Sequence, residues 1–158
     1  MKTTETHLGF PAIHFDSAAT WRNWLEKNHA SSGGLFLIIY KKESGVPSVY
    51  YSEAVDEAIC FGWIDSKINK RDAQSYYQYF TQRNPKSNWS KVNKTKVERM
   101  LRENKMAPAG LASIELAKKT GTWTALDQVE ELELPADLAT ALKKTKKRIR
   151  ILLLSRAR

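Results

Sequence analysis

The chain has 158 residues, of which 42% are hydrophobic and 27% are charged. A domain of this size buries about 68–70% of its extended-chain surface, which is enough for a core that needs no disulfide or metal staple. The composition excludes collagen, low-complexity disorder and a membrane bundle. The single cysteine, Cys60, cannot form an internal disulfide, which favours a reducing compartment.

The net charge of +9 is unevenly distributed. Residues 143–158 contain eight basic residues and no acid, so residues 1–142 together carry only +1. Residues 65–99 contain nine basic and three acidic residues, whereas residues 121–142 contain five acids and no base. A basic segment with aromatic residues is compatible with nucleic-acid binding, but it can also simply neutralise the acidic segment. Nucleic acid is therefore an alternative partner that the charge pattern does not favour.

The first predicted elements are a helix, a strand and a short second strand. Asp16 or Ser17 is a suitable cap for a helix that ends near Asn28. The apolar run Leu35–Tyr40 is typical of a buried strand. After a turn with glycine and proline, Val49–Tyr51 is expected to return as its hairpin partner.

The middle of the chain predicts a helix followed by two strands. Ser52 is a suitable cap for this helix, and Gly62 is expected to end it. The alternating side chains of Trp63–Ile68 and the aromatic run Ser75–Gln82 are both typical of strands.

Beyond these strands the pattern is helical. Ser90 is expected to cap one helix, and a second helix is expected from Pro108 to Lys119, ended by Gly121. Pro135 is at a favoured first-turn position for a last helix.

The order of these elements predicts an α+β fold, with a small antiparallel sheet packed with helices and a helical C-terminal third. We divide the chain into an α+β domain, residues 1–125, and a segment 126–158 that contains an acidic linker and a basic C-terminal helix.

No cofactor or metal ion is predicted. His7, His14 and His29 have no cysteine or histidine partner at the spacing of metal ligands. Cys60 lies beside the apolar face of a predicted helix, where a buried and inert thiol is expected.

The sequence does not contain a recognised catalytic signature. Glu53 and Glu57 share a helix face, but acids in the first turns of a helix are favoured by the helix dipole alone. A small hydrolase or transferase with Asp65 as its acid–base group is an alternative to the leading interpretation, which is a non-enzymatic protein.

Two tryptophan-bearing segments, 61–66 and 83–93, are the candidate functional site. They combine two indoles, a carboxylate, a guanidinium, hydroxyls and an amide, a set that can hold a polar ligand against a flat apolar surface. A guanidinium can also clamp a carboxylate or phosphate with two hydrogen bonds. In the structural alternative the indoles are core residues, the guanidinium and carboxylate pair with each other, and the hydroxyl and amide cap a helix. The candidate ligand- or partner-binding residues are Trp63, Asp65, Arg83, Ser87, Trp89 and Asn93.

The order and spacing of four segments resemble the YdeI/OmpD-associated family, also called bacteriocin-protection proteins. These segments are EAICFGWIDS, YFTQRNPKSNWSKVN, VERMLRENKMAPAGL and AKKTGTW, and the resemblance extends from about Trp21 to about Leu142. Departures from the family pattern are Gln82, Asn84 and Thr122. The resemblance places family signatures on Gly62, Trp63, Ile64, Asp65, Arg83, Ser87, Trp89, Ser90, Asn93, Met106, Gly110, Gly121 and Trp123.

The end of the chain also departs from that pattern, which implies that residues 143–158 are altered or truncated relative to the family. The resemblance implies a bacterial protein linked to envelope stress or to tolerance of bacteriocins and antimicrobial peptides, with no cofactor or reaction.

We therefore expect a cytoplasmic binding or regulatory module, whose partner is a small anionic ligand or another protein. Residues 1–9 are polar and have none of the apolar character of a secretory signal. The longest apolar run, Ile151–Leu154, is too short to cross a bilayer.

Overall fold

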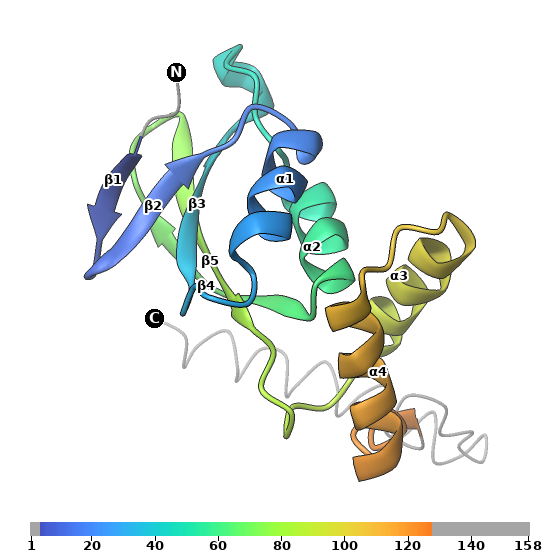
Figure 1. The fold of residues 1–158 in the computed structure, drawn as a ribbon. Helices are drawn as coiled ribbons and strands as arrows, with labels where there is room; N and C mark the ends of the chain where they lie inside the picture. Colours follow the sequence, from blue (N-terminus) through green and yellow to red (C-terminus); the bar gives the residue numbers. More distant parts are fainter. Residues whose placement is uncertain (1–3, 128–158) are drawn as a thin grey trace, which may run out of the picture. The chain divides into compact units, whose positions relative to one another are not determined.

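A five-stranded sheet is covered on one face by helices in the computed structural model, which describes residues 4–127 (Figure 1). The chain divides after Leu126, and the structure presented below is that of the first part. The α+β class is confirmed. The strands are β1 (Thr4–His7), β2 (Phe10–His14), β3 (Leu35–Tyr40), β4 (Trp63–Lys70) and β5 (Ser75–Gln82). The helices are α1 (Ala18–Asn28), α2 (Tyr51–Cys60), α3 (Lys91–Arg102) and α4 (Pro108–Thr120), with a short 3₁₀ helix η1 (Lys42–Ser44).

The strand order is β1-β2-β3-β5-β4, and the sheet is mixed rather than purely antiparallel. β2 and β3 run parallel, whereas the other three pairs are antiparallel. The parallel pair arises because the chain leaves β2, passes through α1 and returns alongside β2. The short strands β1 and β2 were not predicted, since the residues before the first helix contain no long apolar run.

The predicted hairpin strand at Val49–Tyr51 is wrong. Val49 is buried and its backbone N–H donates to the Phe15 carbonyl at 2.9 Å, but Tyr51 is already the first residue of α2. The N-cap of this helix is Tyr50 instead of the predicted Ser52. The backbone N–H of Tyr50 donates to the Glu53 carboxylate at 3.3 Å, so an acid in the first turn satisfies the helix end.

The other helix ends agree with the sequence signals. The hydroxyl oxygens of Ser17 and Ser90 accept hydrogen bonds from the third residue of α1 and α3, at 3.3 and 3.2 Å. Pro108 begins α4, and Gly121 follows its end with a φ of +86°. The helix predicted from Pro135 lies outside the described residues.

Alternation along β3 divides its side chains between the two faces of the sheet. Leu35, Leu37 and Ile39 belong to the main core under α1 and α2, and Phe36 and Ile38 belong to a second cluster on the other face. The main core also contains Val97 and Met100 of α3 and Ile114 and Ala117 of α4, because these two helices pack on α2.

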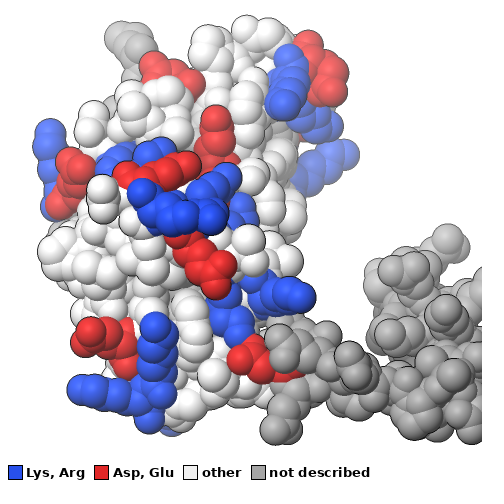
Figure 2. All heavy atoms as spheres, turned by 90° about the vertical axis from the view of Figure 1, so that its right-hand side faces the viewer, with Lys and Arg blue, Asp and Glu red and all other residues white. Residues whose placement is uncertain are grey.

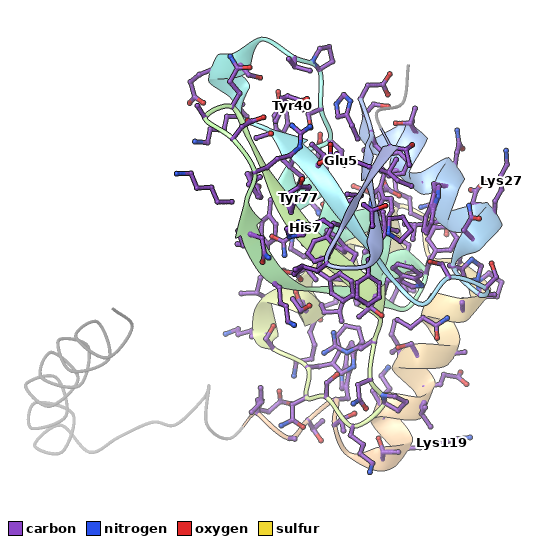
Figure 3. The ribbon with its side chains drawn as sticks, turned by 90° about the vertical axis from the view of Figure 1, so that its left-hand side faces the viewer. Glu5, His7, Lys27, Tyr40, Tyr77 and Lys119 are labelled. Atoms are coloured by element: carbon purple, nitrogen blue, oxygen red, sulfur yellow. The ribbon has the colours of Figure 1, made fainter. Side chains whose placement is uncertain are left out.

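The sheet curls, so that its first strand reaches side chains of β5 and the residue after β4 (Figure 3). The Glu5 carboxylate accepts hydrogen bonds from Arg71 Nε at 3.0 Å and from the Tyr77 hydroxyl. The His7 ring stacks on Tyr77 with centroids 4.0 Å apart. The Arg71 guanidinium and the Tyr77 hydroxyl hold the pKa of Glu5 below its ordinary value.

Glu5→Gln should lower the free energy of unfolding by about 1 kcal/mol at neutral pH, since the Arg71 guanidinium loses a charged partner. Folding lowers the pKa of this carboxyl. The carboxyl therefore stabilises the protein at a pH above its pKa in the unfolded chain, and this stabilisation is lost as the pH falls through its pKa in the folded protein. The free energies of unfolding of wild type and variant, measured in urea, should therefore differ at pH 7, and the difference should shrink as the pH falls below the ordinary pKa of a glutamate. Glu43→Gln, at an exposed position, is the control. If the difference in the free energy of unfolding between wild type and Glu5→Gln were the same at low pH as at pH 7, the ion pair of Glu5 with Arg71 would be contradicted.

Candidate functional site

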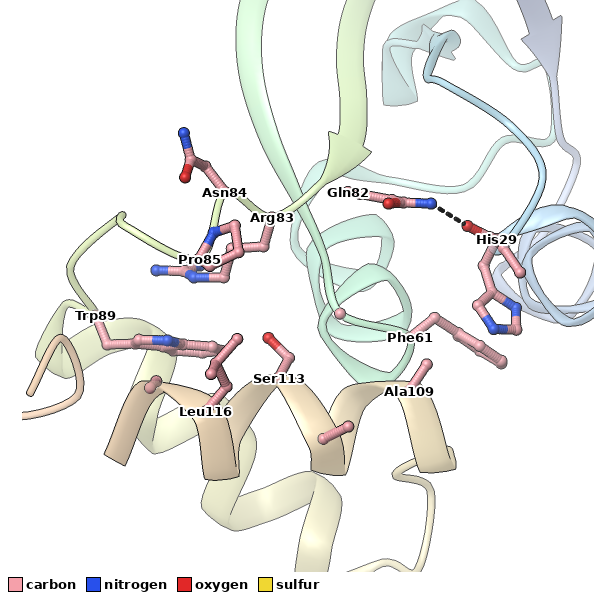
Figure 4. Close-up of a pocket in the computed structure, with 14 residues that line it drawn as sticks. His29, Phe61, Gln82, Arg83, Asn84, Pro85, Trp89, Ala109, Ser113 and Leu116 are labelled. Carbon is pink, nitrogen blue, oxygen red and sulfur yellow. Dashed lines mark hydrogen bonds between the residues drawn. The ribbon is translucent and has the colours of Figure 1, made fainter. Parts of the chain in front are cut away.

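A cleft of about 340 Å³ lies between the segment that follows β5 and the helix α4 (Figure 4). Arg83 and Trp89 form one side of it, and His29 and Phe61 lie at the other side. Side chains of α4, among them Leu116, form its base. The cleft thus combines apolar walls with a guanidinium, as ligand sites commonly do.

Backbone hydrogen bonds fix both ends of the segment that carries Arg83 and Trp89. The Arg83 N–H donates to the Gly62 carbonyl at 2.9 Å, which continues the pairing of β5 with the start of β4. The Trp89 N–H donates to the Thr122 carbonyl at 3.1 Å, beyond the end of α4. The segment is therefore tied to the sheet at one end and to α4 at the other.

The Arg83 guanidinium is stacked on an aromatic ring and is only partly hydrogen-bonded. Its central carbon lies 3.7 Å from the centroid of the Trp89 ring, and Nη2 donates to the Asn88 carbonyl at 2.8 Å. Nε and Nη1 are buried and have no hydrogen-bond partner. Burial lowers the pKa of Arg83 to about 10, although the charge of Asp65 opposes this shift. Arg83 is still a cation at neutral pH, with two donors available for an acceptor.

Of the six predicted site residues, the structure brings Arg83 and Trp89 together in the cleft. Ser87 lies in the same segment, but its hydroxyl donates to the Asn84 carbonyl at 2.7 Å. Asn93 lies in the first turn of α3, where its backbone N–H donates to the Ser90 hydroxyl. Neither Ser87 nor Asn93 lines the cleft, and both have local roles in the backbone.

Trp63 and Asp65 do not line the cleft that contains Arg83. Trp63 is 1% exposed, and its indole N–H donates to the His29 carbonyl at 3.1 Å, so it is a core residue. Trp89 lines the cleft but is itself only 2% exposed and belongs to the same core. The expectation that both tryptophans form one open surface is therefore wrong, because burying a large indole stabilises the core.

Asp65 is bound to α2. Its carboxylate accepts a hydrogen bond from the Tyr51 hydroxyl at 2.6 Å, and no salt bridge to Arg83 forms. Burial, followed by this hydrogen bond and the charge of Asp65, raises the pKa of Tyr51 to about 12. The ion pair considered as a structural alternative is therefore absent from the described residues.

The far side of the cleft was not predicted from the sequence. His29 follows α1, Phe61 caps α2, and Ala109 lies in the first turn of α4. Helix α4 is held in place by a hydrogen bond from the Ala107 N–H to the Cys60 carbonyl at 3.0 Å. The sequence signal that could have placed α4 against the end of α2 is Gly110, since a glycine inside a helix commonly marks a close approach of two backbones.

The basic segment 65–99 does not form a uniform positive patch. Arg71 pairs with Glu5, and Lys96 and Arg99 both pair with Asp56. On the face shown in Figure 2, acidic and basic side chains lie side by side. These pairs reduce the positive field that a nucleic-acid backbone would meet.

Within residues 4–127 the structure does not contain a group of His, Cys, Asp and Glu side chains that could hold a metal ion. Cys60 is fully buried, and this burial is the main cause that raises the pKa of its thiol to about 11. No helix in the same part of the chain is long and apolar enough to cross a membrane.

A family model for a domain of unknown function, DUF8412, matches residues 13–113. No curated protein and no solved structure matches the chain. The matched range contains β3, β4, β5 and the first turns of α4, and thus most of the residues that line the cleft.

Proposed function

The chain belongs to the DUF8412 family, and we propose that it is a non-enzymatic cytoplasmic module that binds a small anionic ligand in the Arg83–Trp89 cleft. The observation that carries this proposal is the buried guanidinium with two unpaired donors. A buried donor without a partner costs about 1–3 kcal/mol, and more when it is charged. A carboxylate or phosphate oxygen that accepts from Nε and Nη1 removes this cost.

The walls of the cleft favour a ligand with an apolar body. Leu116 is 42% exposed, whereas the rings of Trp89 and Phe61 line the cleft as largely buried core residues. Pro85 lies beside the guanidinium (Figure 4). A ligand with one oxyanion and a flat or aliphatic body could pair with the Arg83 guanidinium and also pack against the apolar walls.

Binding includes a small movement of the chain. Because Nε and Nη1 are buried, an oxyanion reaches them only when the neighbouring residues shift. Asn84, Pro85 and Lys86 form an exposed turn beside Arg83, which makes them the segment best suited to move aside.

Binding is favoured over catalysis because Asp65, the group considered for acid–base chemistry, does not line the cleft. A role in envelope stress or in tolerance of bacteriocins is part of the same proposal, and it is supported by the resemblance of the sequence to the YdeI/OmpD-associated family.

Benzoate, its neutral counterpart benzamide and phenyl phosphate are suitable probes. Titrations followed by the NMR signals of the backbone amides and of Arg83 Nε–H should give benzoate about tenfold higher affinity than benzamide, since a hydrogen bond to a charged group contributes about 1.5–3 kcal/mol. Amide signals of the 84–86 turn should shift on binding. The comparison of benzoate with phenyl phosphate identifies the preferred oxyanion.

Arg83→Gln should remove the preference for benzoate, whereas Lys86→Gln should keep it. Lys86 is an exposed cation in the same segment that does not line the cleft. Equal affinity for benzoate and benzamide, or a preference that survives Arg83→Gln, would refute an anion site at Arg83, as would the absence of any shift with all three probes.

A further inference from the structure

The cleft continues into a second hollow, and this continuation limits the class of ligand. The second hollow has a volume of about 400 Å³ and is lined by Arg22 and Glu26 of α1 and by Pro108 at the start of α4. His29, Phe61 and Ala109 line both hollows. In Figure 4 these three residues lie across the cleft from Arg83 and Trp89. The two hollows are therefore adjacent, with the largely buried Phe61 between them, and together they are called the groove.

The charged side chains that line the second hollow are Arg22 and Glu26, and Arg22 is also paired with Glu57, which lies outside the lining. Arg22 Nη1 donates to the Glu57 carboxylate at 2.8 Å, and Nη2 donates to the Lys105 carbonyl at 2.7 Å. Glu57 thus neutralises Arg22, and both groups are mostly buried. The Glu26 carboxylate lies 3.5 Å from Arg22 Nε and is 53% exposed, so it faces the solvent with a charge that is not fully compensated.

The middle of the groove is aromatic. The Phe61 ring lies 5.2 Å from the central carbon of Arg22 and its centroid lies 5.1 Å from that of His29. His29 Nδ1 is 2.7 Å from the Leu25 carbonyl, which can only accept, so Nδ1 carries the hydrogen of this bond. The groove therefore has a positive end at Arg83, an apolar middle at Phe61 and a negative end at Glu26.

We infer that the groove binds a linear zwitterion whose carboxylate lies at Arg83, whose apolar chain crosses Phe61 and whose ammonium lies at Glu26. This inference rests on the proposed function and adds a second charge on the ligand, placed at Glu26. A ligand with only an anionic end would leave the Glu26 carboxylate with Arg22 as its counter-charge, and Arg22 is shared with Glu57.

The test is a titration of the full chain with ω-amino acids of increasing length, each compared with the ω-hydroxy acid of the same length. The two compounds share the carboxylate and the chain and differ in whether the far end carries a positive charge. At the length that reaches Glu26, the ω-amino acid should bind about threefold more tightly, which is the size of effect expected for a half-exposed ion pair. Shorter compounds should show no difference between the two end groups.

Glu26→Gln should remove this difference, measured as the ratio of the affinities for the two compounds at the length that reaches Glu26. Glu43→Gln is the matched control, because Glu43 is an exposed glutamate of η1 that lines neither hollow. The control should retain the preference for the ω-amino acid.

Three outcomes separate this inference from the proposed function. If binding depends on Arg83 but the two end groups are equivalent at every length, the zwitterion is refuted and the anion site is retained. If the preference for the ammonium survives Glu26→Gln, the negative end is not at Glu26 and the inference is also wrong. If Arg83→Gln leaves the affinity of both series unchanged, the anion site itself is refuted.

Discussion

Arg83→Met should abolish the preference for anions and still leave the free energy of unfolding within about 1 kcal/mol of wild type. Methionine removes a buried charge with two unpaired donors, which lowers the cost of folding. It also removes the hydrogen bond to Asn88 and the contact with the Trp89 ring, which together stabilise the native state by a similar amount. Urea unfolding and a benzoate titration of the same preparation measure both effects.

Arg71→Met is the matched control for this result. The Arg71 guanidinium is paired with Glu5 through two nitrogens, so its loss should cost about 2 kcal/mol by leaving a carboxylate without its partner. A loss of several kcal/mol in Arg83→Met, equal to or greater than that of Arg71→Met, would mark Arg83 as a structural residue and contradict a binding role.

Gly110→Ala should lower the free energy of unfolding by about 3 kcal/mol, although alanine is the better helix former. A methyl group at this position would lie 2.2 Å from the Cys60 carbonyl oxygen and 2.9 Å from the Met106 terminal methyl. The carbonyl belongs to the backbone at the end of α2 and cannot rotate away, so α4 must move. Chemical denaturation measures the loss.

The same change should weaken benzoate binding, because α4 forms the base of the cleft. Gly33→Ala is the control: an added methyl group there would meet nothing within 4 Å, so the stability should change little. A Gly110→Ala protein as stable as wild type would show that the two helices do not approach as closely as described.

The elements that the sequence predicts correctly are those with local signals. Ser17 and Ser90 cap helices through their own hydroxyls, and the apolar run Leu35–Tyr40 is a strand with the predicted bounds. The parallel pairing of β2 with β3 was not predicted, because it depends on contacts between segments about twenty-five residues apart, which no local pattern encodes. The capping of α2 was misplaced because a carboxylate rather than a serine satisfies the end of this helix.

The site was predicted only where its residues are close together in the sequence. Arg83 and Trp89 lie in one segment, so a reading of that segment found both. The position of His29 and α4 opposite these two residues depends on tertiary hydrogen bonds, such as that from the Ala107 N–H to the Cys60 carbonyl. Trp63 was assigned to the site on its residue type, but the burial of a large indole stabilises the core and outweighs its use as a ligand surface.

The arrangement of the five tryptophans supplies two separate optical reporters. Trp21, Trp24 and Trp63 form one group in the core, with centroids 5.6–6.4 Å apart, whereas Trp89 and Trp123 form a pair 5.1 Å apart beside Arg83. Both groups contribute to the near-ultraviolet circular dichroism of the folded chain. Occupation of the cleft should change the contribution of the pair, which contains the cleft residue Trp89, whereas heating should abolish both contributions.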